Sequence, residues 1–190
     1  PGLLTALLRG KDLDADATAW AMGEILSGEA LSIAVGDGLA ALKGDGMLEG
    51  RPVKFSWQQY LESEGKPFSS QIEASLNADR DLRQELGIDL SDWVEGSLPV
   101  DVTYTEYNGG KAEALVLADL KPAILKVTPF DYRKPAGVDG KARATTILRN
   151  GLPEEIKGLE IETPVLKLEK GQLFFDVSGE ESILQRGNIP

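Results

Sequence analysis

The residue types that most often perform catalysis are missing from this chain. Its 190 residues include no His and no Cys. The usual general base near neutral pH, the Ser-His and Cys-His nucleophile pairs and the commonest zinc ligands are therefore absent. A Ser-Lys pair or a pair of carboxylates remains available, but 31 acidic residues make some close pair inevitable, and they are expected on the solvated faces of strands. The sequence predicts no enzyme and no catalytic residue.

One acidic motif matches part of a calcium-binding loop but lacks two of its required residues. Asp12, Asp14 and Asp16 match the first ligands of a calcium-binding loop, which needs Gly at its sixth position and Glu at its twelfth. Those two positions hold Ala17 and Gly23. We therefore predict no metal site and no cofactor.

Charge and composition exclude further classes of function. The net charge of −11 opposes nucleic acid, whose binding requires Lys and Arg to displace the phosphate counterions. No apolar run approaches the ~20 residues that span a bilayer, and Leu3 to Leu8 is too short and lacks the basic region of a signal peptide. The absence of Cys fits an oxidising compartment. Because the first residue is Pro, we expect the chain to be part of something longer.

The clearest structural pattern is a predicted hairpin over residues 98–120. From Leu98 to Tyr107 apolar and polar side chains alternate, as in a half-buried strand. Asn108-Gly109-Gly110 supplies residues that tolerate positive φ, which a tight turn requires. Lys111 to Leu120 alternates in the same way, and the two segments are predicted to pair as antiparallel strands.

Similar alternating segments recur along the chain. Breaks such as Gly36-Asp37-Gly38, Gly44-Asp45-Gly46 and Lys170-Gly171 are interpreted as turns between them. The two Gly-Asp-Gly breaks are not phosphate-binding loops, because neither leads into a helix with Lys followed by Ser or Thr. Strands are predicted over residues 12–23, 30–35, 39–43, 52–58, 68–76, 98–107, 111–120, 123–127, 142–148, 159–163, 165–169 and 173–177.

One short helix is predicted over residues 78–86. Asn77 precedes it as the N-cap, and Asp79 lies in its first turn. A further turn of helix between Leu90 and Gly96 is expected to pack Trp93 on the sheet. The fold class is therefore mainly β: a long antiparallel meander, curled into an open groove or arranged as a sandwich-like sheet.

Several motifs occur in a characteristic order between residues 46 and 137. They are Glu49-Gly50-Arg51-Pro52-Val53, a strand with Trp57, Asp79-Arg80-Asp81-Leu82-Arg83, Leu86-Gly87-Ile88-Asp89-Leu90, Gly96-Ser97-Leu98-Pro99-Val100-Asp101-Val102-Thr103-Tyr104, Ala118-Asp119-Leu120 and Tyr132-Arg133-Lys134-Pro135-Ala136-Gly137. This order, which covers about half the chain, resembles the domain of AsmA-like, YhdP-type proteins of Gram-negative bacteria. Tyr132 and Ala136 depart from the Trp and second Pro of the family.

The resemblance implies a location and a function. It implies a large periplasmic protein, anchored in the inner membrane by an N-terminal helix that this chain lacks. Residues 1–190 would be a single β-rich segment of it, forming an open apolar groove (a β-taco) that conducts phospholipid toward the outer membrane. Burial of each CH₂ is worth ~0.8 kcal/mol, so an acyl chain of roughly 16 carbons would cost ~12 kcal/mol to drag through water. A groove removes that barrier without catalysis.

The expected partners of the groove are phospholipid acyl chains, neighbouring segments of the same protein and other envelope proteins, with no nucleic acid. The residues expected to line it share the apolar side of their strands: Val100, Val102, Tyr104, Ala114, Val116, Leu166, Leu168, Phe175 and Val177.

Three alternatives stay open at this point. Aromatic residues such as Phe55, Trp57, Phe68, Phe174 and Phe175 could close an ordinary core instead of lining a groove. The chain could be an assembly module, as in TamB-type proteins, whose exposed strand edges pair with a partner strand. An enzyme acting on an envelope glycan would need two carboxyl groups roughly 5 to 10 Å apart in a cleft.

Overall fold

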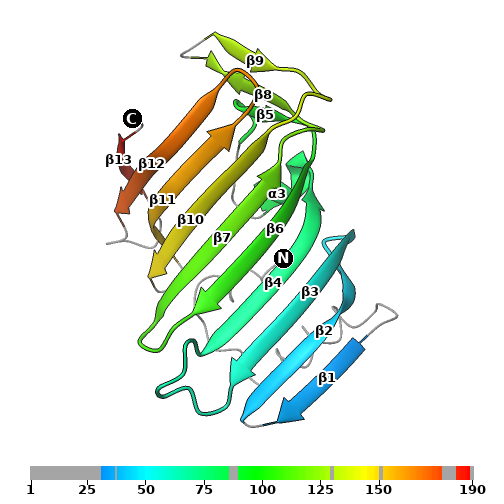
Figure 1. The fold of residues 1–190 in the computed structure, drawn as a ribbon, viewed down its shortest axis with the longest axis vertical. Coiled ribbons are helices and arrows are strands. Elements are labelled where there is room, and N and C mark those ends of the chain that lie inside the picture. Colours follow the sequence, from blue (N-terminus) through cyan, green and yellow to red (C-terminus); the bar gives the residue numbers. More distant parts are fainter. Residues whose placement is uncertain are drawn as a thin grey trace.

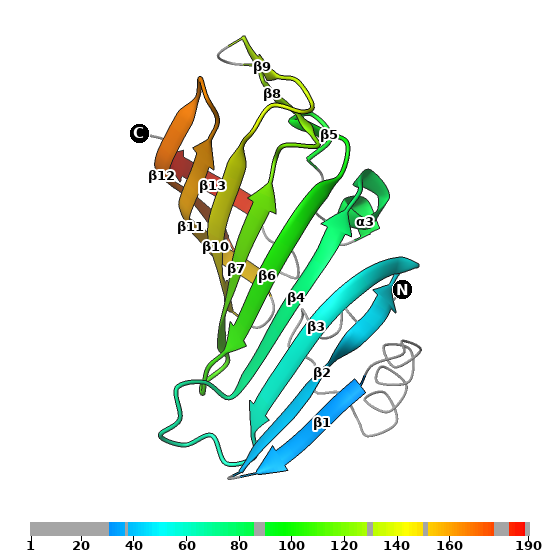
Figure 2. The same ribbon diagram turned by 45° about the vertical axis from the view of Figure 1, so that its right-hand side comes forward.

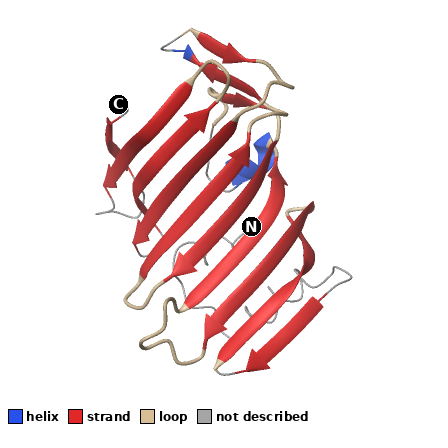
Figure 3. Cartoon of the chain, viewed as in Figure 1, coloured by secondary structure: helices blue, strands red, loops and turns tan. Residues whose placement is uncertain are grey.

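The computed structural model describes residues 31–36, 38–85, 90–128, 131–149, 152–176 and 183–188. Strands make up most of this part of the chain, as Figure 3 shows. In sequence order its elements are β1 (Leu31–Gly36), β2 (Leu39–Leu48), β3 (Arg51–Tyr60), β4 (Ser70–Ala78), α3 (Arg80–Glu85), β5 (Val94–Glu95), β6 (Leu98–Glu106), β7 (Lys111–Asp119), β8 (Ile124–Val127), β9 (Tyr132–Lys134), β10 (Lys141–Arg149), β11 (Leu152–Glu162), β12 (Lys167–Asp176) and β13 (Ile183–Asn188).

The described strands form two antiparallel sheets of unequal size. The large sheet has ten strands in the order β1-β2-β3-β4-β6-β7-β10-β11-β12-β13, and the small sheet has three in the order β5-β8-β9. The large sheet is a long twisted ladder with the small sheet at one end (Figure 1). It does not close, because β1 and β13 are its two edges (Figure 2). The predicted mainly β fold with an open antiparallel meander is confirmed.

The predicted central hairpin forms as expected. β6 pairs with β7 so that Val102 lies opposite Val116. Gly109 and Gly110 adopt φ values of 94° and 77° in the turn between the two strands. A β-branched residue would be strained at either position, and this is why the turn is placed here.

Two predicted turns are wrong, because the strands run through them. Gly44-Asp45-Gly46 lies inside β2, where Gly44 is opposite Phe55 and Gly46 is opposite Val53. Small residues beside larger cross-strand partners are compatible with a strand. The actual turn follows at Glu49 and Gly50, which adopt φ values of 47° and 75°.

The second wrong turn is Lys170-Gly171, which lies inside β12. Lys170 has a φ of 61°, and the pairing of β11 with β12 shifts register between Leu159 and Ile161. The break in the sequence pattern therefore marks a bulge, not the end of a strand.

The predicted helix is present, but it begins later than expected. Asn77 is not the N-cap, because Asn77 and Ala78 are still paired with β6. Asp79 is the capping residue instead: the Leu82 backbone N–H donates to its Oδ1 atom at 2.9 Å. Leu82 of this helix is fully buried.

The turn before β5 orients Trp93 differently from the prediction. A helical turn does form, with the Val94 backbone N–H donating to the Leu90 carbonyl at 2.8 Å. Trp93, however, is 46% exposed, while Val94 is buried. Val94 lies opposite Leu125 of β8, and both side chains belong to the buried cluster, so it is Val94 that faces the core.

The main cluster of buried side chains lies between the small sheet and one end of the large sheet. It consists of Val94, Leu98, Leu120, Ala123, Leu125 and Val127, and Val100, Ala118 and Ala142 of the large sheet pack against it. β8 was predicted as the next strand of the meander, but it leaves the large sheet and pairs with β5 and β9. The small sheet therefore covers one end of the large sheet.

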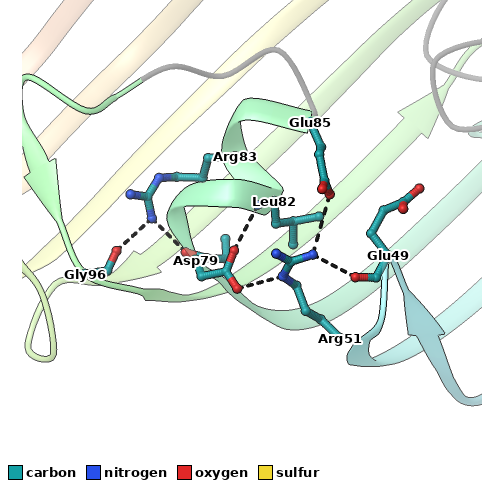
Figure 4. Close-up of polar contacts among 8 residues, drawn as sticks. Glu49, Arg51, Asp79, Leu82, Arg83, Glu85 and Gly96 are labelled. Atoms are coloured by element: carbon teal, nitrogen blue, oxygen red, sulfur yellow. Dashed lines mark hydrogen bonds and ion pairs between the residues drawn. The ribbon is translucent and has the colours of Figure 1, made fainter. Parts of the chain in front are cut away.

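Two buried cationic side chains donate hydrogen bonds to main-chain carbonyls near the small sheet and α3. Lys134 is 1% exposed, and its Nζ atom donates to the carbonyls of Ala123, Pro135 and Val138 at 2.8, 3.0 and 3.0 Å. Arg83 is 4% exposed and donates to the carbonyls of Ala78 and Gly96 at 2.8 and 3.0 Å. Figure 4 shows Arg83 reaching from α3 toward Gly96.

An ion pair joins β3 to the start of α3. Arg51 Nε donates to Asp79 Oδ2 at 2.7 Å, and Arg51 Nη1 donates to the Glu49 carbonyl at 2.7 Å (Figure 4). The hydrogen bond from Arg51, followed by that from the Leu82 N–H, lowers the pKa of Asp79 below its usual 3.8.

Because the pKa of Asp79 is lower in the folded protein, part of the free energy of unfolding depends on pH. The contribution of Asp79 is present above the unfolded-state pKa of 3.8, and it is lost as the pH falls through the lowered folded-state value. The Tm of the unsubstituted protein should fall when the pH drops from about 6 to about 3. The Tm of Asp79→Asn, whose side chain cannot ionise, should fall by less over the same pH range. Thermal melts at both pH values measure this, and an unchanged pH dependence would contradict it. Asp92→Asn, which removes the same charge at an exposed position, is the control.

Candidate functional site

The strand register places mainly apolar side chains in three rows that run across the large sheet. Residues directly opposite each other in antiparallel strands share a face. The first row is Val53, Leu76, Val100, Ala118, Ala142, Ile161 and Leu168; the second is Phe55, Ala74, Val102, Val116 and Ala144; the third is Leu42, Trp57, Ile72, Tyr104, Ala114, Thr146, Ile156 and Leu173. We call the surface formed by these three rows the apolar face.

Most of the residues predicted to line a groove lie in these rows. The structure brings together Val100, Val102, Tyr104, Ala114, Val116 and Leu168, all of them half-buried. Leu166 lies outside the strands and packs against the buried cluster under the small sheet. Phe175 pairs with Leu184 at the end of β12, and its side chain lies outside the described residues, as does Val177.

The apolar face extends further than the sequence indicated. Phe55, Trp57, Ala74 and Ala144 also belong to it, although they were not among the predicted lining residues. The alternation of Val53, Phe55 and Trp57 was visible, but grouping them with Val102 requires the register of three strands, β3, β4 and β6. That register depends on turns whose positions the sequence did not give.

The opposite face of the large sheet is polar, and we call it the charged face. Its cross-strand neighbours are hydrogen-bonded: Ser56 to Glu73 at 3.1 Å, Gln71 to Thr105 at 3.1 Å and Ser75 to Asp101 at 2.6 Å. From β7 to β12 one row alternates in charge through Asp119, Lys141, Glu162 and Lys167. Opposite charges on neighbouring strands stabilise the pairing. The two faces are therefore sharply different.

A hollow of about 720 Å³ crosses β4, β6, β7, β10, β11 and β12. Its lining includes Pro99 and Asp101 on either side of Val100, and Leu117 and Asp119 on either side of Ala118. The second-row residues Val102 and Val116 do not line it. The hollow is thus a trough between two rows of side chains on the charged face. Its mixed charges, with Lys141 and Arg143 beside Glu160 and Glu162, give it no single ligand preference.

The middle of the apolar face has no second layer among the described elements. Extensive contacts there are confined to neighbouring strands and to pairs within the small sheet. The small sheet packs on Val100, Ala118 and Ala142 of the first row. Within the described ranges no three acidic side chains gather as a metal site.

No described helix is long and apolar enough to cross a membrane.

Comparisons with known proteins leave most of the chain unmatched. No protein-family model matches it, and no solved structure matches it. Over 46 residues it is 52% identical to the anthranilate phosphoribosyltransferase of Streptomyces griseus subsp. griseus and 54% identical to that of Nocardioides sp.. These matches cover 24% of this chain, and the chain spans only 13% and 14% of the two enzymes. The similarity is to an enzyme, but it is confined to a quarter of the chain.

Proposed function

We propose that this chain is a non-enzymatic lipid conduit, which carries phospholipid acyl chains along its apolar face. The observation that supports this most directly is the set of three continuous rows on one side of an open sheet. The first row runs from β3 to β12 across seven neighbouring strands, and the second row runs from β3 to β10 across five. At ~4.8 Å between strands the first row extends roughly 29 Å and the second roughly 19 Å. Both lengths exceed the ~15 Å occupied by the chains of one bilayer leaflet.

The chemistry of the face fits movement more than tight binding of one lipid. The second row offers only hydrocarbon, through Phe55, Ala74, Val102, Val116 and Ala144. Every position along such a row gives a sliding acyl chain similar dispersion contacts and similar shielding from water. No step requires a bond to be made or broken, so the lack of His and Cys is no handicap.

The cellular setting of this proposal comes from the resemblance to AsmA-like, YhdP-type proteins. In that setting the chain is a periplasmic segment of an inner-membrane-anchored protein, and it carries phospholipid toward the outer membrane. The charged face meets the aqueous periplasm, and the acyl chains travel on the apolar face. The match to anthranilate phosphoribosyltransferase covers 24% of the chain, which is too little to carry a proposal of enzyme activity.

A lipid-transfer measurement tests the conduit. Purified protein incubated with vesicles of fluorescently labelled phospholipid should acquire label, which is quantified after the vesicles are removed by flotation. Lipid extracted from the protein and identified by mass spectrometry should include diacyl species at about one or more per chain. Protein that stays empty under both conditions would contradict the proposal.

A second candidate function rests on the edges of the large sheet. Among the described strands, β1 and β13 each pair on one side only. The sequence of β1 is Leu-Ser-Ile-Ala-Val-Gly, with no charge and no Pro to discourage a further strand. An assembly module would bind a partner strand there. Recovery of barrel-assembly proteins in a pull-down, from protein that binds no lipid, would favour this function over the conduit.

A further inference from the structure

A short polar border lies at one side of the apolar face, on β3, β4 and β6; the same row continues as the buried apolar residues Ala112 and Leu148. Beyond the third row, the register places Gln59, Ser70 and Glu106 side by side on the same face. The neighbouring third-row positions hold Trp57 and Tyr104, and Trp57 Nε1 donates to Ser70 Oγ at 3.2 Å. The face therefore changes, within four residues along β6, from the hydrocarbon of Val102 through Tyr104 to the carboxylate of Glu106. Indole and phenol groups occupy such apolar-to-polar boundaries in membranes.

The carboxylate of Glu106 has no cationic partner among the described residues. Its backbone carbonyl accepts from Ser69 N at 2.8 Å and from Ser69 Oγ at 3.0 Å, but its side chain takes part in none of the ion pairs of that part of the chain. The residue is half-buried. Burial raises the pKa of the Tyr104 hydroxyl, and the charge of Glu106 raises it further, so the two groups lie near each other.

Two aromatic side chains lie beside the polar border. Trp57 and Tyr104 stand on either side of Ile72 in the third row. The hydrogen bond from Trp57 Nε1 to Ser70 Oγ directs the indole toward the border, where Ser70 lies opposite Glu106. An aromatic face attracts an ammonium group within ~6 Å of its ring centroid. Glu106 adds a full negative charge on the same side.

We propose that Trp57, Tyr104 and Glu106 bind the ammonium group of a zwitterionic phospholipid, while its acyl chains lie on the second row. This inference rests on the proposed function and adds a head-group preference to it. An anionic head group would meet Glu106 without a compensating cation, on a chain whose net charge is −11. The head group would lie at the polar border, and the chains would extend across Ile72 toward Ala74 and Val102.

A competition between two head groups tests the preference. The protein is incubated with vesicles of equimolar phosphatidylethanolamine and phosphatidylglycerol with identical acyl chains, and the bound lipid is extracted and quantified. We expect the bound ratio to favour phosphatidylethanolamine about three- to five-fold, the scale of a partly exposed ion pair with an aromatic contribution. Glu106→Gln and Trp57→Leu should each bring the ratio close to one, with total lipid unchanged.

The matched control is Glu73→Gln. Glu73 lies on the charged face, where it is exposed and accepts from Ser56 Oγ, so this change removes the same charge away from the apolar face. It should keep the wild-type ratio. An equal loss of preference in both Gln variants would overturn the site, since it would show that net charge alone selects the lipid.

Further outcomes are equally decisive. A wild-type ratio near one, with lipid still bound, would overturn the head-group site and leave the conduit standing. Protein that binds neither lipid would overturn both. Free phosphoethanolamine at the same concentration should not displace the lipid, and displacement would show that a soluble amine is the true ligand.

Discussion

Lys134→Met is expected to lower the free energy of unfolding by about 2 to 4 kcal/mol, the range for buried polar groups that lose their partner. Lys134 is 1% exposed, and its ammonium group donates to three carbonyls within 3.0 Å. Met fills a similar volume but donates nothing, so the carbonyls of Ala123, Pro135 and Val138 would stay unpaired in the folded protein.

The three carbonyls come from two different connections, which is why one side chain has such an effect. Ala123 precedes β8, while Pro135 and Val138 follow β9. The Gly137 backbone N–H also donates to the Lys121 carbonyl at 2.7 Å, so the segment after β9 is held against the segment before β8. Without Lys134 the small sheet should loosen from the large one.

Urea unfolding and hydrogen exchange measure this effect. The denaturation midpoint should fall, and the backbone amides of β8 and β9 should exchange faster than those of β6 and β7. Arg133→Met is the control, because the neighbouring Arg133 is exposed, and a surface change of this kind is usually worth less than about 0.5 kcal/mol. Equal losses for the two variants would contradict the role assigned to Lys134.

Lys134 also illustrates what the sequence could not predict. A Lys between Arg133 and Pro135 is expected to lie in solvent at the end of a strand, because Lys is almost never fully buried without partners. Its partners are main-chain carbonyls, which every residue carries. The pattern of side chains in the sequence therefore cannot predict these hydrogen bonds. The predicted N-cap failed for a related reason: whether Asn77 or Asp79 caps α3 depends on how far β4 stays paired with β6, up to Ala78 opposite Leu98.

Local patterns were more informative than long-range ones. The hairpin of β6 and β7 was predictable because alternation and the Asn-Gly-Gly turn lie in one continuous stretch, and its Val102 to Val116 pairing follows from them. The departure of β8 from the meander was not, since a short apolar strand carries no mark of the sheet that it joins. The apolar face combines both cases: each strand shows its apolar side, but only the register aligns those sides into rows.

Val102→Arg is expected to abolish lipid loading while leaving the protein folded. Val102 lies in the middle of the second row, opposite Ala74 on β4 and Val116 on β7. It is half-buried, and the side chain of Ala74 is small. An Arg stem can lie along this face while its guanidinium reaches toward water, but any acyl chain on the row would then meet a charge. Val116→Arg should have the same effect.

Thr103→Arg is the matched control, because it places the same charge one residue away on the opposite side of β6. Thr103 lies opposite Glu73 and Leu115 on the charged face, so lipid loading and Tm should stay close to those of the unsubstituted protein. The three variants are compared by thermal melting and by the amount of labelled phospholipid taken up from vesicles.

A closed core predicts a different result for the same variant. If the apolar face were packed dry against another layer, Val102→Arg would bury an uncompensated charge, which is among the few single changes worth more than about 4 kcal/mol, and the protein would unfold. The outcomes separate cleanly, since loss of lipid with a retained Tm requires a face that opens to ligand, whereas loss of both requires a face that the fold itself needs. An unfolded Val102→Arg protein beside a stable Thr103→Arg protein would therefore contradict the conduit, because an acyl chain can lie only on a surface that the folded chain leaves available.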